Sequence, residues 1–505
     1  MAVFTPSPLF TDGAVLCCGR EIRVFGQAED GIALHGILKD SAGRILAEAG
    51  AVSAQGRFEL TFPPQEPAEG CTLTITDGRG ENFEAADVAI GEVYLAGGQS
   101  NMELPLSGTE EGPETAAASR DPLLRFFNTP RMPFDSPENR KLLAGTRWHA
   151  VSPEFSGGCS AAAVFFGLKM REKHPGTPVG IIACYWGGTS VTCWMDGETL
   201  QGMEEGRRYL REYEEKCAGK SLEQFLEEEA AFQASLDQWN GTVEAYREAH
   251  PDAPWMEIEN ACGKCPWNPP AGPGSPYRPG GLAVQMLRPL APVALTAFLY
   301  YQAEEDAGRT EHYDVLMTAM IGLWRRWFRA GDTPFLFVQL PMWLDFGAED
   351  RREWARTRLA QARVRDTVPG AGMICLLDQG EYGNIHPTRK RPVGERLAEL
   401  ACRILYGTGE VSPRACGLRR DGKALVVELT QPAEMRDGIR SLLEIAGADG
   451  NFLPADGTAE GTVLRVWADA VPDPVCVRYA WTDYEAEVPL WGKNGLPAEP
   501  FRLSL

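Results

Sequence analysis

The chain has 505 residues, enough for about three domains of ordinary size. Apolar residues make up 44% and charged residues 24%, the composition of a globular protein with an apolar core. With 49 Lys and Arg against 70 Asp and Glu, the net charge is −21, which argues against nucleic acid and anionic membranes as partners.

The N-terminal stretch and the cysteines predict a cytoplasmic location. MAVFTPSPLFTDG lacks the basic region and apolar core of a signal peptide, and no apolar run is long enough to span a membrane. The 13 cysteines are odd in number and scattered through predicted strands and helices, as reduced thiols are. Cys262 and Cys265 form one C-x-x-C without a second pair or a nearby His, so a zinc or redox role is the weaker interpretation.

Residues 1–88 are rich in short β-prone runs that turn signals such as Asp77-Gly78 separate. This pattern predicts a small antiparallel β-sandwich. His35 lies in an alternating run and is interpreted as structural. The predicted strands are 21–25, 32–38, 57–62 and 71–76.

The stretch from Gly91 to Glu103, GEVYLAGGQSNME, begins as an apolar strand, breaks at two glycines and continues to Ser100. A serine between a strand and a helix has an exposed hydroxyl and nearby unpaired N–H groups, the two features a serine nucleophile needs. The alternative is a serine that only caps a helix. Met102 stands where the G-x-S-x-G elbow of α/β-hydrolases has its second glycine, so that motif is absent.

After this stretch, strands alternate with helices up to about residue 410, which predicts a parallel sheet with helices on both faces. In such sheets the sites lie at the carboxyl ends of the strands. Gly-rich or polar segments follow several of these strands, namely 97–100, 186–189, 302–306 and the segment from Asp378. The predicted strands are 124–127, 178–185, 294–302, 334–341 and 373–378, and the predicted helices are 160–172, 312–330, 351–367 and 390–406.

Between about residues 197 and 281 lies a long insertion. Its part 222–250 is acidic and helical in period, and 266–279 is rich in Pro and Gly. The insertion is interpreted either as a lid or specificity element or as a solvated helical decoration.

A serine hydrolase needs a general base, and the chain offers six histidines. His386 is the candidate, because it lies in a loop between a buried strand and the last helix, at the same sheet edge as Ser100. The other five lie in the N-terminal strands, at predicted helix ends or away from any site signal: His35, His149, His174, His250 and His312.

From residue 411 the β pattern returns and predicts a second small β-domain, with strands at 424–429, 441–445, 462–467 and 475–481. Trp481, Trp491 and Asn494 are candidates to contact a sugar, but packing in the core is the default for isolated Trp.

Several motifs, in chain order, resemble those of the sialate O-acetylesterase family in the SGNH hydrolase superfamily, over nearly the whole chain. They are LFTDGAVL, GGQSNME, PVGIIACYWGGTSVTCW, YYQAEEDAGR, NIHPTRKRPVGERLA, RYAW and GLPAEPF. The resemblance implies an α/β fold: a three-layer α/β/α SGNH domain with a parallel sheet at 89–410, carrying the insertion 197–281. Small β-domains at 1–88 and 411–505 would flank it.

The resemblance also implies roles for individual residues. Ser100 is the implied nucleophile and His386 the implied general base. The oxyanion hole would combine the Ser100 N–H with an N–H of Gly187 or Gly188. The third motif contributes oxyanion or substrate-binding positions, which are Gln302, Glu304 and Asp306.

The third motif departs from the family pattern. Asp306 stands where the family has Asn, and a carboxylate cannot donate a hydrogen bond unless it is protonated. Three interpretations stay open: Asp306 has a different task, Gln302 supplies the donor, or the site is weakened. Ala303 and Glu305 replace the usual glycine and serine.

The histidine motif departs as well, because Gly383 occupies the acid position of D-x-x-H. The partner of His386 is then Asp378, Glu381 or a backbone carbonyl, and Asp378 is preferred because it ends a buried strand.

The expected function is a carbohydrate O-acetylesterase that needs no metal or organic cofactor. The resemblance implies O-acetylated sialic acid as the small-molecule substrate. The alternatives are acetylated xylan or another polysaccharide, and a catalytically weak sugar-binding relative. The sequence leaves the oligomeric state open.

Overall fold

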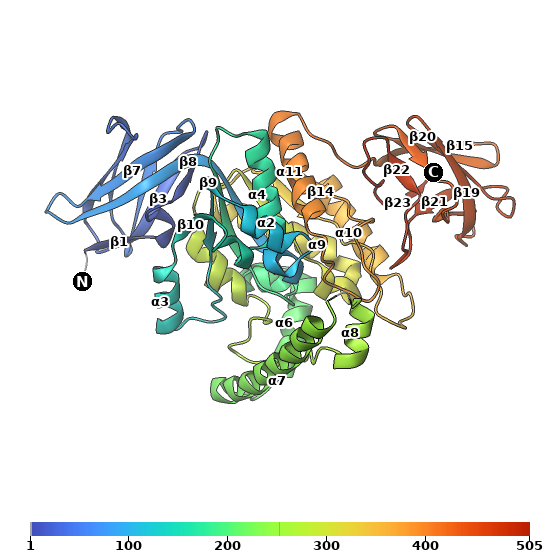
Figure 1. The fold of residues 1–505 in the computed structure, drawn as a ribbon, viewed down its shortest axis with the longest axis horizontal. Coiled ribbons are helices and arrows are strands. Elements are labelled where there is room, and N and C mark those ends of the chain that lie inside the picture. Colours follow the sequence, from blue (N-terminus) through green and yellow to red (C-terminus); the bar gives the residue numbers. More distant parts are fainter. Residues whose placement is uncertain (1–2, 252) are drawn as a thin grey trace.

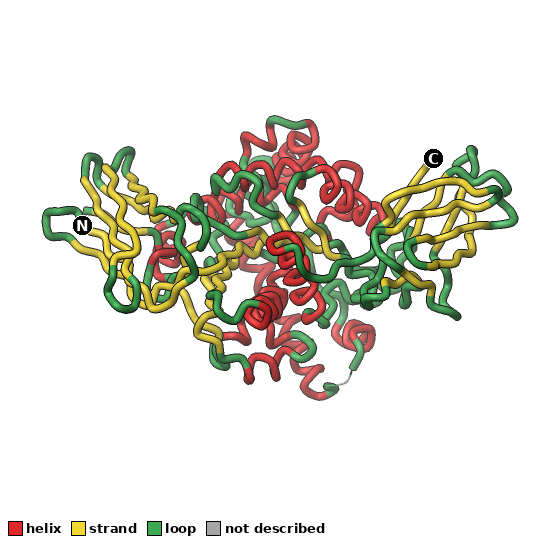
Figure 2. The backbone as a smooth tube through the Cα atoms, turned by 90° about the horizontal axis from the view of Figure 1, so that it is seen from above, coloured by secondary structure: helices red, strands yellow, loops and turns green. Residues whose placement is uncertain are grey.

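The computed structural model describes residues 3–251 and 253–505. Figure 1 shows an elongated molecule in which helices surround a central sheet and a β-rich region lies at each end. Figure 2 shows the same arrangement from above, with the two chain ends in the opposite β-rich regions. The protein therefore has a mixed α/β fold.

The N-terminal region consists of two facing groups of strands. One group is β1 (Phe4–Pro6), β3 (Ile22–Ala28) and β6 (Arg57–Phe62). The other is β4 (Ala33–Lys39), β5 (Ile45–Val52), β7 (Ala68–Thr76) and the first part of β8 (Asn82–Gly98). The groups pack closely at Gly36 of β4, where a Cβ atom would lie 2.8 Å from Phe62 and 2.9 Å from Leu60.

Strand β8 belongs to two different pairings. Residues 82–90 pair with β7 in antiparallel fashion, and residues 92–98 pair in parallel fashion with β11 (Val179–Tyr185) and, from residue 94, with β12 (Ala297–Tyr301). One unbroken strand of 17 residues thus runs from the N-terminal region to the residue before Gln99. Strand β8 crosses residue 88 without interruption, so no strand end marks the expected domain boundary at that residue. The boundary stays a prediction.

The central sheet has the strand order β10-β9-β11-β8-β12-β13-β14. All neighbouring strands are parallel except the pair β9–β10. Each predicted strand between residues 124 and 378 overlaps one of these strands, although sequence analysis missed β10. The strands not yet given are β9 (Asp121–Asn128), β10 (Trp148–Val151), β13 (Phe335–Val338) and β14 (Ala371–Ile374).

Helices cover both faces of this sheet. Tyr94 of β8 packs on Phe166 of α4 (Ala161–Lys173), with ring centroids 4.7 Å apart. Gly97 of the same strand faces Trp324 of α9 (Tyr313–Trp327). Successive residues of a strand point to opposite faces, so the odd spacing of 94 and 97 places α4 and α9 on opposite sides.

Two further helices complete these faces. Helix α11 (Arg391–Tyr406) packs on α4 at Gly394, where a Cβ atom would lie 2.5 Å from Phe165. Helix α10 (Glu353–Thr367) packs beside α9. The four helices match the four predicted from periodicity, with ends shifted by a few residues.

The insertion forms its own group of helices, seen below the sheet in Figure 1. The predicted acidic helix is α7 (Leu222–Ala249), which begins with a capping box at Ser221. An irregular loop follows α8 and returns to the sheet. The other helices are α5 (Gly197–Gln201), α6 (Glu204–Cys217) and α8 (Trp255–Cys262).

The C-terminal region is an antiparallel sheet of order β15-β16-β20-β19-β18-β21-β23, with the pair β17–β22 beside it. All four predicted strands overlap strands of this sheet. Its strands are β15 (Ala415–Asp421), β16 (Ala424–Leu429), β18 (Leu443–Ala446), β19 (Leu453–Glu460), β20 (Val463–Trp467), β21 (Cys476–Tyr479) and β23 (Phe501–Ser504), and the pair is β17 (Ala433–Met435) and β22 (Leu490–Gly492).

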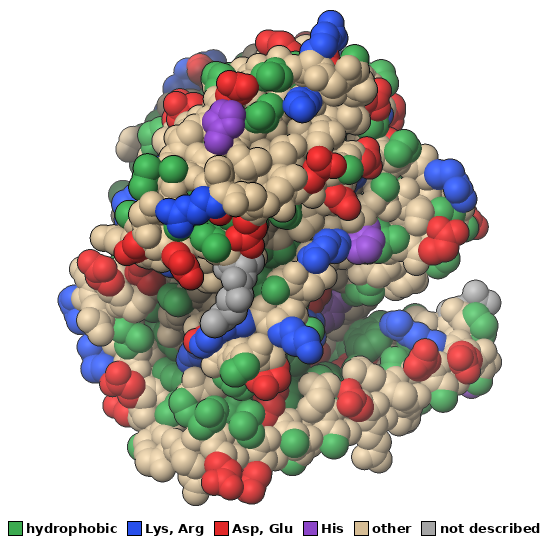
Figure 3. All heavy atoms as spheres, turned by 90° about the vertical axis from the view of Figure 1, so that its left-hand side faces the viewer, with side chains coloured by type: hydrophobic (Ala, Val, Ile, Leu, Met, Phe, Trp, Pro, Cys, Tyr) green, Lys and Arg blue, Asp and Glu red, His purple; other side chains and the backbone are tan. Residues whose placement is uncertain are grey.

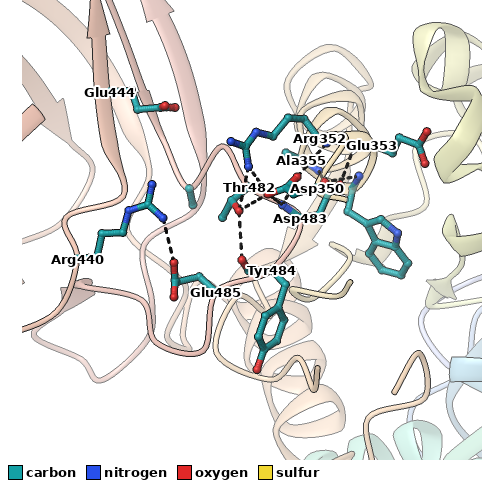
Figure 4. Close-up of polar contacts among 12 residues, drawn as sticks. Asp350, Arg352, Glu353, Ala355, Arg440, Glu444, Thr482, Asp483, Tyr484 and Glu485 are labelled. Carbon is teal, nitrogen blue, oxygen red and sulfur yellow. Dashed lines mark hydrogen bonds and ion pairs between the residues drawn. The ribbon is translucent and has the colours of Figure 1, made fainter. Parts of the chain in front are cut away.

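A polar junction joins this region to α10 (Figure 4). Asp483 caps α10, because its carboxylate accepts hydrogen bonds from the backbone N–H of Trp354 at 2.9 Å and of Ala355 at 3.1 Å. The carboxylate of Asp350 accepts from the Thr482 hydroxyl at 2.6 Å and from the Asp483 N–H at 3.2 Å. Two carboxyl groups therefore lie side by side at the junction.

The surface charges and the cysteines agree with what the composition indicates. On the face seen in Figure 3, acidic and basic side chains are interspersed. All 13 cysteines are free, including Cys262 and Cys265. In the described part of the chain, no helix is both long and apolar enough to cross a bilayer.

Candidate active site

Ser100 begins the short helix α1 (Ser100–Glu103) directly beyond the end of β8. The turn before it requires glycine, because Gly98 has φ of +136° and a Cβ atom there would lie 2.0 Å from the carbonyl oxygen of Tyr301. As the first residue of a helix, Ser100 has an N–H without an intrahelical acceptor. No hydrogen bond within the described chain occupies this N–H.

His386 lies opposite Ser100, in the loop between β14 and α11. Its Nε2 atom is 2.9 Å from the Oγ atom of Ser100, although 286 residues separate the two along the chain. The structure thus brings the implied nucleophile and the implied base into hydrogen-bond contact at the carboxyl edge of the sheet. A neutral ring with an unprotonated Nε2 can accept the hydroxyl proton.

The loop that carries His386 is held by Glu381. One carboxylate oxygen of Glu381 accepts from the side-chain amide of Asn384 at 2.7 Å, and the other accepts from the Thr388 N–H at 2.8 Å. Asn384 in turn accepts from the N–H of His386 at 3.0 Å. Glu381 therefore shapes the loop instead of binding the imidazole.

Asn101 ties the implied nucleophile to the loop that carries His386. Its amide nitrogen donates to the carbonyl of Ile385 at 2.9 Å and to Glu304 at 2.5 Å. Its amide oxygen accepts from the ammonium of Lys390 at 2.6 Å. One buried side chain next to Ser100 thus contacts the residue before His386 and bridges an acid and a base.

The electrostatics of this cluster keep His386 neutral. Surrounding protein atoms, and then the charge of Lys390, lower the pKa of His386 below its usual value. Burial lowers the pKa of Lys390 to about 7, and burial also raises the pKa of Glu304. An imidazole with a lowered pKa is free to accept a proton at neutral pH.

Asp378, the partner of His386 that the sequence analysis preferred, is bonded to another residue. Its two carboxylate oxygens accept from the guanidinium of Arg396 at 2.7 and 2.6 Å. In the described chain, no hydrogen bond or ion pair joins the imidazole of His386 to a carboxylate. The strand ends at Ile374 instead of Asp378, and the guanidinium of α11 is the stronger partner for a carboxylate in the turn that follows.

The two glycines after β11 differ in their bonding. Gly187 lies against Ser100, since a Cβ atom there would be 3.3 Å from the Cβ of Ser100, but its N–H donates to Glu103 at 2.7 Å. Glu103 also pairs with Arg131. The N–H of Gly188 has no acceptor in the described chain. Gly188 is therefore the freer of the two oxyanion donors.

Asp306 is buried and serves as an acceptor for four donors. They are the hydroxyls of Ser190 at 2.6 Å and Tyr209 at 2.9 Å, the Val191 N–H at 2.8 Å and the Gln302 amide at 2.7 Å. Gln302 also donates to the Thr189 carbonyl at 3.0 Å. Both side chains anchor the loop after β11, so neither has a donor left for an oxyanion.

The insertion reaches the site through Trp267. This half-exposed ring lies so close to Gly188 that a Cβ atom there would be 2.1 Å from it. Trp267 packs edge-on against Tyr277, with centroids 5.6 Å apart, and Arg131 lies over Trp186 at 5.2 Å. The insertion thus contributes an aromatic wall beside the predicted oxyanion donors.

Comparison with known proteins places the chain among esterases. No family model matches it. It is 24% identical to the sialate O-acetylesterase of Rattus norvegicus over 88% of this chain and 81% of that protein, and 23% identical to the Homo sapiens enzyme over 82% and 75%. A carbohydrate acetylesterase from Xanthomonas citri, 28% identical, superposes with a TM-score of 0.76 over 99% of both chains.

The resemblance to the sialate O-acetylesterases is confirmed. It extends over nearly the whole chain, as the seven motifs indicated. The solved carbohydrate acetylesterase shares the mixed α/β fold from end to end.

Sequence reasoning missed Asn101, Lys390, Glu103 and Trp267. The first three lie inside motifs that were recognised, within four residues of Ser100 or His386, and this proximity was the available signal. Trp267 lies in an irregular loop, where no periodicity relates it to the sheet.

Proposed function

We propose that this protein is a carbohydrate O-acetylesterase in which Ser100 is the nucleophile and His386 the general base. The observation that carries the proposal is the 2.9 Å contact between the Oγ atom of Ser100 and the Nε2 atom of His386. The similarity to named acetylesterases supports the ester class and the sugar class of the substrate.

The reaction proceeds in two halves. The Oγ of Ser100 attacks the acetyl carbonyl while its proton moves to Nε2 of His386. The tetrahedral intermediate collapses, and the sugar oxygen leaves with the proton from Nε2. Water then attacks the acetyl-serine, giving its proton to Nε2, and acetate departs as the proton returns to Ser100.

The negative charge of the intermediate faces backbone donors. The free N–H groups of Ser100 and Gly188 are the proposed oxyanion hole. Gly187 joins them when substrate displaces the carboxylate of Glu103 from its N–H. Asn101 positions the loop, and the charge of Lys390 helps to keep the imidazole neutral.

We propose a Ser–His dyad, with Glu381 and Asn101 as positioning residues. This arrangement replaces the D-x-x-H acid, because Asp378 is engaged by Arg396. Gln302, Glu304 and Asp306 support the floor of the site instead of contacting the oxyanion.

The proposed substrate is an O-acetylated sialic acid, since the curated relatives carry that activity in their names. Acetylated xylan or another polysaccharide is the alternative substrate. The aromatic wall of Trp267 and Tyr277 supports the role of the insertion as a specificity element, because sugar rings pack on aromatic faces.

We also propose a finer architecture and a location for the protein. The central region 89–410 is proposed to be a three-layer SGNH hydrolase domain between two small β-domains, 1–88 and 411–505. The free cysteines support a reducing, cytoplasmic location.

The test of the catalytic assignment is acetate release from a chromogenic acetyl ester. Ser100→Ala and His386→Ala should each lower kcat by about a thousandfold or more, because nucleophile and base act as a unit. Ser107→Ala, an exposed serine nearby, is the matched control and should keep the parent rate.

Equal rates for the parent and Ser100→Ala would remove Ser100 from the mechanism. A fluorophosphonate probe should label the parent and spare Ser100→Ala. A weak sugar-binding relative would escape labelling. A panel of O-acetylated sialic acids and xylo-oligosaccharides then identifies the preferred sugar.

A further inference from the structure

A cavity of about 420 Å³ lies where α10 and the segment at Thr310 and Glu311 meet the first and last strands of the C-terminal region. Its volume lies within the range of sites for small molecules. Five arginines line it, in a protein whose net charge is −21. They are Arg356, Arg363, Arg365, Arg414 and Arg502.

Carboxylates neutralise part of this charge. Arg363 donates to Asp314 at 2.7 Å, and Arg365 donates with two nitrogens to Asp366, each at 2.9 Å. Arg365 also pairs with Glu499. These two arginines are therefore already paired with carboxylates of the protein.

The remaining cations are open to a ligand. Arg414 lies 3.3 Å from Asp366, which it shares with Arg365. Arg356 and Arg502 form no ion pair within the described chain, and both are exposed. Unpaired guanidinium groups at a cavity wall offer fork-shaped donors that match a carboxylate or sulfate group.

An apolar wall stands beside these cations. Arg478 and Arg502 both lie over the ring of Trp481, at 5.1 and 5.9 Å. Leu359 and Phe501 also line the cavity. Trp481, which the sequence offered as a possible sugar contact, is half-buried here. An apolar wall next to unpaired arginines suits a sugar ring that carries an acidic group.

The overall negative charge of the molecule favours a small anionic ligand over a long polyanion. A surface of net charge −21 repels long polyanions at a distance, whereas a small anion needs only the local field of the cavity. We propose that this cavity binds an acidic monosaccharide, with its carboxylate on Arg356 and Arg502 and its ring beside the apolar wall that includes Trp481. This second sugar site is separate from the esterase reaction.

The test is a calorimetric titration of the full-length Ser100→Ala protein with D-glucuronate, N-acetylneuraminate, D-glucose and inorganic sulfate. We expect saturable binding of the two acidic sugars that weakens as salt increases. The double variant Arg356→Gln, Arg502→Gln should lose at least about tenfold in affinity, because the charge-assisted hydrogen bonds disappear. Trp481→Phe should weaken the sugars and leave sulfate unaffected.

The matched control is Arg403→Gln on α11, an exposed arginine without an ion pair in the described chain, which should keep the parent affinity. Unchanged binding in the double variant would overturn the proposal. Glucose binding as tightly as glucuronate, or sulfate binding as tightly as either acid, would also overturn it. When Ser100 is intact, the double variant should have the same esterase rate as the parent. This result would separate the cavity from the proposed catalytic site.

Discussion

Lys390 is the charged residue that most directly affects the pKa of His386, the proposed general base. Its ammonium is buried behind Asn101, and its charge follows burial as a cause of the lowered pKa of His386. The sign of its effect is therefore fixed: a positive neighbour disfavours the imidazolium and keeps the base ready at mildly acidic pH.

Lys390→Met should move the acidic limb of kcat/KM to higher pH. The limb reports the pKa of His386 in the free enzyme, and loss of the positive charge raises that pKa. In the parent the limb should lie below the ordinary histidine value of about 6.5. Arg389→Met, one residue earlier, is the control and should leave the limb in place. A limb that does not move in Lys390→Met would contradict this prediction.

Asp306→Asn should impair the protein, although it restores the family residue. The Asp306 carboxylate accepts four hydrogen bonds, and an amide would turn its NH₂ group toward some of the same donors. The expected cost in the free energy of unfolding is about 1–3 kcal/mol, with a lower kcat. Urea unfolding and acetate release measure both. A gain in rate would mean that the native site is weakened.

The motifs predicted Ser100 and His386 as the reacting pair, because a short motif encodes its own turn. They did not predict which N–H groups are free, since Glu103 occupies Gly187 through a contact across 84 residues. The departure at Ala303 was visible in the sequence. Its consequence, φ of +149° at a residue that is not glycine, needed coordinates.

Among the elements, α11 is joined to the turn after β14 by the buried ion pair of Asp378 and Arg396. Both side chains are 12% exposed. The pair fixes the two ends of the segment from which the His386 loop projects. This ion pair therefore contributes to the free energy of unfolding, and it affects catalysis only because the site needs a folded protein.

Asp378→Asn tests this division. Breaking a buried pair costs about 3–5 kcal/mol in the free energy of unfolding. The kcat of the folded fraction should stay within a few-fold of the parent. If Asp378 oriented His386, kcat would instead fall by about ten-thousandfold, as in enzymes that depend on such an acid. Thermal melts and active-site titration with the fluorophosphonate separate the two outcomes.

Periodicity predicted the helices and strands of the centre well, because each buries one face or both. It did not predict that β8 continues through the boundary at residue 88. Residues on both sides of that boundary are apolar, and only pairing partners distant in sequence reveal which sheet each half joins. The ends of the elements shifted by a few residues, since capping contacts set them.

The molecule as a whole is held at its C-terminal junction by the paired carboxyls of Asp350 and Asp483 (Figure 4). Burial, together with the charge of Asp350, raises the pKa of Asp483. Burial opposes the ionisation of Asp350 as well, but hydrogen bonds led by that of Thr482 lower its pKa. The pair therefore retains one proton more readily than two isolated carboxyls would.

Asp483→Asn should make the junction less sensitive to pH. A raised pKa in the folded state contributes stability at low pH that is lost as pH rises through that pKa. Asn still caps α10 but does not ionise. The Tm of the variant minus that of the parent should therefore increase as pH rises from about 4 to about 7.

Asp456→Asn, an exposed aspartate of β19, is the control for this series. Its Tm should follow that of the parent at every pH. A difference in Tm between Asp483→Asn and the parent that stays constant over the whole range would contradict a titrating pair.

The unbroken course of β8 restricts how this architecture is exchanged in evolution or in engineering. A chimaera joined at residue 89 would take the two halves of β8 from different parents. The half before the junction pairs with β7 and anchors the start of the strand that leads to Ser100. We infer that swaps which preserve activity will have their crossover points before residue 82, so that the donor supplies neither half of β8.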